Sequence, residues 1–212
     1  MPTTRHIIVC EGESERAYLQ RLQAFLDDQE VAAGSFDAPL CFIGPEHAVA
    51  NIGTFGKIKS TYNKTRTANR GRSIHVWADF DLYHRNDKHC ATHYAAKTAG
   101  IPDFLFSFHN FEDFIALHTS GDEFREWLSL GNEGYFENPA PSPEHSELIK
   151  KIVKGYRKGS LPADFVTKER LMNLKANLSF QPKSNPHRLQ NIGKFADFLV
   201  GQLERHHPEV FR

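Results

Sequence analysis

The chain has 212 residues, of which 40% are hydrophobic and seventeen are Phe, a composition typical of a globular protein with a sizeable core. Its 26 basic and 26 acidic residues balance, so no overall charge attracts nucleic acid. No apolar run approaches the roughly 20 residues that span a bilayer, and the first residues lack a signal-peptide core. We therefore expect a cytoplasmic protein without a membrane partner. The three cysteines are widely spaced and form no C-x-x-C pair, which argues against a disulfide framework or a cysteine zinc site.

Strands and helices alternate in the first part of the chain. Short apolar runs rich in β-branched residues predict strands over residues 6–10, 39–43, 73–81 and 103–107. Helical spacing of apolar residues predicts helices over residues 14–26, 46–63, 87–98 and 110–118. Such alternation predicts an α/β fold with a mainly parallel sheet flanked by helices.

A segment rich in Gly and Pro, GNEGYFENPAPSPEHS, separates this part from the rest of the chain. Beyond it, helices are predicted over residues 143–156, 162–178 and 186–205, each beginning near a proline. The sequence thus predicts an α/β domain over residues 1–130 and a helical C-terminal extension over residues 131–212, packed on that domain.

Acidic residues follow three of the predicted strands. Glu11 closes the first strand, Asp79 and Asp81 close the third, and Glu112 comes just after the fourth. Ligands of an open α/β sheet bind at the carboxyl ends of its parallel strands. We therefore expect these carboxylates to converge on one edge of the sheet, with Glu15 joining them because it lies one helical turn after Glu11.

A cluster of carboxylates without His or Cys suits Mg²⁺ or Mn²⁺ better than zinc. A second interpretation of the stretch CEGESERAYL needs no metal, because Glu13 and Glu15 in a first helical turn also stabilise the helix dipole. Glu13 is expected to face solvent.

Two stretches are strongly basic. The first carries six basic residues and no acid within residues 57–72: Lys57, Lys59, Lys64, Arg66, Arg70 and Arg72. The second, residues 150–158, carries five. Either can bind nucleic-acid phosphates or be a solvated helix face, and Tyr62 and Tyr156 can stack on bases or pack in the core.

Histidines offer a competing metal site. His89 and His93 are four apart on a predicted helix, with His84 nearby, a spacing that can bind zinc. Surface histidines at this spacing are also common by chance.

The order of these motifs resembles a known family. An apolar strand that ends in Glu-Gly, followed about seventy residues later by a strand that ends in Asp-x-Asp, is similar to the TOPRIM domain, over roughly residues 5–118. More narrowly, VCEGESERAYL, VWADFDLY, FSFHNFEDFIALH and PKSNPHRLQNIGKF resemble the RloB-like family, which is related to the TOPRIM nucleases of the OLD family.

The resemblance implies a metal-dependent hydrolase that cleaves nucleic-acid phosphodiester bonds in DNA or RNA, tRNA included. Glu11 matches the glutamate of the first TOPRIM motif, and Asp79 and Asp81 match the Asp-x-Asp. Glu15 matches an additional acid of OLD-like nucleases, and Glu112 the glutamate after the last strand of RloB-like proteins. These five residues would hold one or two Mg²⁺ or Mn²⁺ ions. RloB-like proteins are also associated with defence against phage, commonly beside an ATPase partner.

The alternative is a non-catalytic subunit that binds nucleic acid or metal and works with a partner ATPase. Phe195, Phe198 and Leu199 could then dock the partner, although residues at this helical spacing more often lie in a core.

Overall fold

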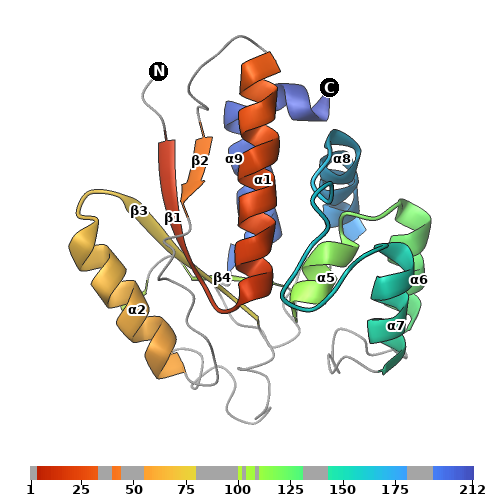
Figure 1. Ribbon diagram of the computed structural model, residues 1–212, viewed down its shortest axis with the longest axis horizontal. Coiled ribbons are helices and arrows are strands. Elements are labelled where there is room, and N and C mark those ends of the chain that lie inside the picture. The colour runs from red at the N-terminus through yellow and green to blue at the C-terminus, as the bar shows by residue number, and fades with distance from the viewer. Residues whose placement is uncertain are drawn as a thin grey trace.

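The computed structural model describes residues 4–32, 40–43, 55–79, 100–101, 104–107, 110–130, 143–180 and 193–212. A parallel sheet with helices on both faces forms its centre (Figure 1). This confirms the expected mixed α/β fold. Within these ranges, no helix combines the length and the apolar character needed to cross a membrane.

The elements follow the predicted alternation, with shifted boundaries. The strands are β1 (Thr4–Cys10), β2 (Leu40–Ile43), β3 (Ser73–Ala78), β4 (Phe104–Phe106) and β5 (Gly193–Lys194). The helices are α1 (Glu13–Ala32), α2 (Phe55–Ala68), α5 (Phe111–Ala116), α6 (Gly121–Ser129), α7 (Pro143–Ile152), α8 (Lys168–Asn177) and α9 (Phe195–His206), with 3₁₀ turns η2 (Leu178–Phe180) and η3 (Pro208–Phe211). The helix predicted over 87–98 lies outside the described residues.

The sheet has the strand order β2-β1-β3-β4-β5, and each of these pairings is parallel. Strand β2 lies on one side of β1, whereas β3 and then β4 follow on the other side. The order therefore reverses between β1 and β3, and such a point in a doubly wound sheet opens a crevice at the carboxyl ends of the strands.

Alternate residues of the strands enter two separate cores. Ile8, Cys10, Trp77 and Leu105 pack with α1, α5 and α9 on one face. Ile7, Val9, Val76 and Phe106 pack with Ile58 and Tyr62 of α2 on the other. Successive strand residues point to opposite faces, so these buried runs explain why the strands lie inside the molecule (Figure 1).

The C-terminal part is mainly helical, as expected, but it also completes the sheet. Strand β5 pairs with β4, and the ring of Phe195 stacks on that of Trp77, with centroids 3.6 Å apart. Residues after 140 therefore share the core of the N-terminal part. The division into domains at residue 130 stays a prediction.

Three differences from the predicted helices have local causes. Helix α6, which the sequence pattern missed, is started by a capping box between Ser120 and Glu123. Helix α7 ends earlier than predicted, before a turn in which Gly155 and Gly159 have positive φ. Helix α8 starts later, where the side chain of Thr167 caps its first turn.

Candidate functional site

Glu11 and Asp79 lie side by side where the strand order reverses. The backbone N–H of Glu11 donates to the carbonyl of Trp77 at 3.0 Å, which extends the β1 to β3 pairing by one residue. The Oε2 of Glu11 then accepts a hydrogen bond of 2.7 Å from the backbone N–H of Asp79. Glu11 is only 7% exposed. Two strand ends thus hold its carboxylate beside Asp79, as the sequence predicted from the parallel-sheet rule.

Glu15 has a role at the helix start and an unusual charge state. It is the third residue of α1, and its carboxylate accepts from the backbone N–H of Gly12, as in half of a capping box. A Cβ at position 12 would lie 3.1 Å from its Oε2, so the glycine leaves room for this carboxylate. Glu15 is 3% exposed, and burial, together with the charges of Glu11 and Glu112, raises its pKa to about 8.

Glu112 enters the site from the first turn of α5. Its Oε1 accepts a hydrogen bond of 2.7 Å from the hydroxyl of Tyr156, a residue of the segment between α7 and α8. Burial raises the pKa of that hydroxyl, and the carboxylates of Glu112, Asp79 and Glu15 add to the rise. Tyr156 therefore stays protonated and donates to Glu112.

The donor set partly fits a hard cation. Carboxylate oxygens are the ligands that Mg²⁺ and Mn²⁺ prefer, and the repulsion felt by Glu15 is of the kind that a cation relieves. Yet within the described part of the chain no three Asp, Glu, His or Cys side chains are close enough together to hold a metal. Asp81, the fifth predicted ligand, lies outside the described residues, as do His84, His89 and His93.

The six predicted phosphate-binding residues do not form one patch beside the carboxylates. Helix α2 leads into β3, so it runs antiparallel to the strands, and its 14 residues span about 21 Å. Lys57, which is exposed, and Lys59, which is half-buried, lie at its start, toward the carboxylate edge. Lys64 lies farther along, and the remaining three occupy the end of α2 and the turn before β3, at the opposite edge: Arg66, Arg70 and Arg72.

The remaining residues considered from the sequence lie away from the carboxylates or in the core, and one further lysine lies at the carboxylate edge. Glu13 is exposed and pairs with Arg16 at 3.7 Å, in agreement with its predicted solvent-facing position. Tyr62 and Tyr156 are buried, which excludes them as exposed platforms for bases. Lys194, which the sequence did not single out, ends β5 at the same edge as the carboxylates, because it pairs in register with Phe106.

Comparisons with models of known protein families, with curated proteins and with solved structures found no match to this chain. The fold and the site described above are therefore the ground for any functional assignment.

Proposed function

We propose that the protein is a metal-dependent nuclease of the TOPRIM type, which hydrolyses phosphodiester bonds of DNA or RNA, tRNA included. The observation that carries the proposal is the contact between Glu11 and Asp79 at the point where the strand order reverses. The motif resemblance adds the expectation of a role in defence against phage, and the lack of a predicted membrane span adds that of a cytoplasmic location.

Glu11 and Asp79 would hold Mg²⁺ or Mn²⁺, together with Asp81 and with help from Glu15 and Glu112. A bound ion of this kind supplies an activated water and neutralises charge that develops on the phosphodiester. The hydrogen bond from the N–H of Asp79 keeps the carboxylate of Glu11 in one orientation. Tyr156 does the same for Glu112. Lys57 and Lys59 lie at the end of α2 toward this edge and suit the phosphate backbone of a substrate.

The test is cleavage of end-labelled single-stranded DNA, duplex DNA, RNA and tRNA, each with Mg²⁺, with Mn²⁺ and with EDTA. We expect metal-dependent cleavage, and about a hundred- to thousandfold loss of rate in Asp79→Asn and Glu11→Gln. Gln keeps an oxygen that can accept from the N–H of Asp79, so Glu11→Gln removes the charge and preserves the backbone contact.

Glu13→Gln is the matched control, because Glu13 lies two residues from Glu11 but is exposed to solvent. It should cleave at the rate of the native chain. Thermal unfolding of each variant shows whether a loss of rate reflects a loss of folding. Cleavage that persists in EDTA, or that is equal in Asp79→Asn and the native chain, would exclude the proposed site.

The second candidate is a non-catalytic subunit that binds nucleic acid or metal and works with an ATPase partner. The apolar residues considered for docking do not form an open surface, because Phe195 and Leu199 are buried and Phe198 is half-buried against the core. Absence of cleavage on all four substrates, combined with a partner ATPase that co-purifies with the tagged chain, would support this candidate.

A further inference from the structure

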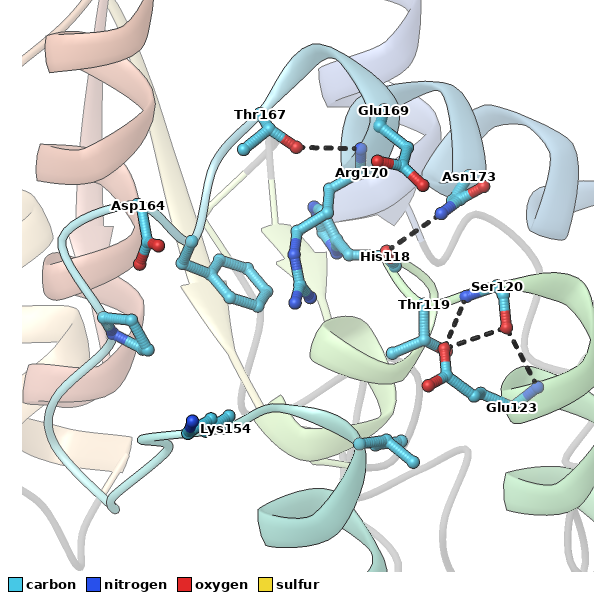
Figure 2. Close-up of a pocket in the computed structure, with 13 residues that line it drawn as sticks. His118, Thr119, Ser120, Glu123, Lys154, Asp164, Thr167, Glu169, Arg170 and Asn173 are labelled. Carbon is cyan, nitrogen blue, oxygen red and sulfur yellow. Dashed lines mark hydrogen bonds between the residues drawn. The ribbon is translucent and has the colours of Figure 1, made fainter.

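A cavity of about 450 Å³ lies beyond the end of α5. Its walls are residues 118–120 after α5, Glu123 of α6, Ile152 at the end of α7, the segment between α7 and α8, and the first turns of α8 (Figure 2). This volume falls in the range of small-molecule sites, roughly 300–1,000 Å³. None of the carboxylates at the strand ends lines it. The cavity is thus separate from the candidate nuclease site.

The side chain of Arg170, from the first turn of α8, points into this cavity (Figure 2). Its guanidinium lies over the ring of Phe165, 4.7 Å from the centroid. Its Nη1 is buried and, within the described part of the chain, has no hydrogen-bond partner; no ion pair to this guanidinium is found there either. A buried cationic nitrogen without an acceptor is unfavourable. An oxygen-rich anion that fits the guanidinium fork would give this nitrogen its acceptor.

Other features of the walls also favour an anion. Lys154 lines the cavity from the segment between α7 and α8. Helix α8 begins at the cavity, with Thr167 as its cap, so the positive end of its dipole lies there. Because this is a ten-residue helix with a cation in its first turn, the two effects act on the same small region.

The histidine of the wall is neutral and is held by its neighbours. The Nδ1 of His118 lies 3.0 Å from the carbonyl of Phe114, so Nδ1 carries the proton and donates to it. Its Nε2 then accepts from the hydroxyl of Tyr18 at 2.9 Å. Burial, together with the charge of Arg170, lowers the pKa of His118 to about 3. Arg170 and Lys154 are consequently the cations among the described lining residues.

Among the described residues, the acidic side chains of the wall form no ion pair with Arg170. Glu123 is engaged by Ser120, whose N–H and hydroxyl both donate to its Oε2. Asp164 and Glu169 are exposed, where water screens their charge. Their carboxylates can instead accept hydrogen bonds from hydroxyl groups of a ligand, as can the side-chain oxygen of Asn173.

We propose that this cavity is a binding site for a small organic phosphate that also carries hydroxyl groups. The phosphate pairs with Arg170 and Lys154 at the start of α8, while the hydroxyls face the polar residues of the wall. This site is independent of the proposed nuclease activity, because it shares no residue with the carboxylate edge.

The test is isothermal titration calorimetry of the full chain with ribose 5-phosphate, with ribose and with inorganic phosphate. We expect ribose 5-phosphate to bind with a sub-millimolar Kd, inorganic phosphate to bind more weakly, and ribose not to bind at about 10 mM. Arg170→Gln should weaken ribose 5-phosphate about tenfold or more, and Lys154→Ala by less. Arg157→Ala is the matched control, since Arg157 is an exposed cation of the same segment that does not line the cavity.

The place at which ribose 5-phosphate binds is checked by amide chemical shifts, which should change at Thr119, Thr167 and Asn173 when this ligand is added. If Arg170→Gln does not fold, Lys154→Ala and these shifts still decide the matter, because Lys154 is exposed and its loss leaves the core intact. Lack of ribose 5-phosphate binding at about 10 mM would overturn the proposal. So would equal affinity in Arg170→Gln and Arg157→Ala, or shifts confined to residues outside the cavity.

Discussion

Glu112 and His118 lie at opposite ends of α5 and face two different electrostatic environments. At the start of the helix, Glu112 joins carboxylates that repel one another, to the point that burial and repulsion raise the pKa of Glu15 to about 8. Beyond the end of the helix, His118 lines a cavity in which the buried Nη1 of Arg170 has no hydrogen-bond partner among the described residues. The first region suits a cation and the second an anion.

The two regions are also built differently. At the carboxylate edge, hydrogen bonds from backbone N–H groups at the strand ends fix the positions of Glu11 and Asp79 relative to each other. At the cavity, side chains of an irregular segment and of a helix start define the walls. The segment between α7 and α8 contacts both regions. Its Tyr156 donates a hydrogen bond to Glu112, and the guanidinium of Arg170 lies over the ring of its Phe165. Variants of each region can therefore test whether the two are energetically separate.

The largest expected effect on the free energy of unfolding comes from Glu15, and it depends on pH. Its folded pKa of about 8 lies above its ordinary value of 4.5, so between these values the folded state binds more protons than the unfolded state. In EDTA, this residue should therefore stabilise the fold fully below about pH 4.5 and lose that contribution as pH rises through 8. The expected loss is of the order of 2 to 4 kcal/mol in the free energy of unfolding, measured by urea denaturation.

Glu15→Gln should remove this dependence and be more stable than the native chain at pH 8.5 in EDTA. Measurements are best compared above pH 6.5, since the lowered pKa values of His6 and His118 make the fold gain stability as pH rises toward 6.5. The same decline in the native chain and in Glu15→Gln would show that Glu15 is not the cause.

At the cavity, Asn177 supports the wall with two hydrogen bonds, and the effect of its loss should not depend on pH. This buried side chain donates to the carbonyls of Leu117 at 3.0 Å and Thr119 at 2.9 Å, which ties the wall after α5 to α8. Asn177→Ala should lower the free energy of unfolding by about 1 to 3 kcal/mol, equally at pH 6.5 and 8.5, because two buried carbonyls lose their donor.

Asn173→Ala is the matched control for this change. Asn173 is half-buried on the same helix, and its contact with the carbonyl of His118 is 3.5 Å long. It should cost no more than about 0.5 kcal/mol. A loss as large as that of Asn177→Ala would mean that the position on α8, and not the paired hydrogen bonds, sets the stability of this wall.

The carboxylate edge could be anticipated because it follows from local patterns and one topological rule. The apolar runs before Glu11 and Asp79 predict strands, and parallel strands bring their ends together. The same reasoning also anticipated a helix-start role for Glu15. It could not give the protonation of Glu15, because this depends on burial by residues distant in the chain.

The contacts made by the C-terminal part were not readable from sequence for physical reasons. Strand β5 has two residues, too few for any periodicity, and it forms because β4 offers an open edge. Arg170 lies in an ordinary helical pattern, and nothing local distinguishes a guanidinium over Phe165 from one in solvent.

The six basic residues of the first stretch also look like one patch in the sequence, yet a helix and a turn place half of them at the opposite edge of the sheet.

The smallest expected effect tests whether the segment between α7 and α8 couples the two regions. Tyr156→Phe removes one hydroxyl, and with it the 2.7 Å hydrogen bond to Glu112, while the ring keeps its place in the core. The free energy of unfolding should fall by about 1 kcal/mol, because half-buried Glu112 can accept from water instead. The affinity for ribose 5-phosphate should stay within about twofold of the native value, because Phe165 and Lys154 keep their backbone support. A tenfold loss of that affinity in calorimetry would show that the carboxylate edge and the cavity act as one unit.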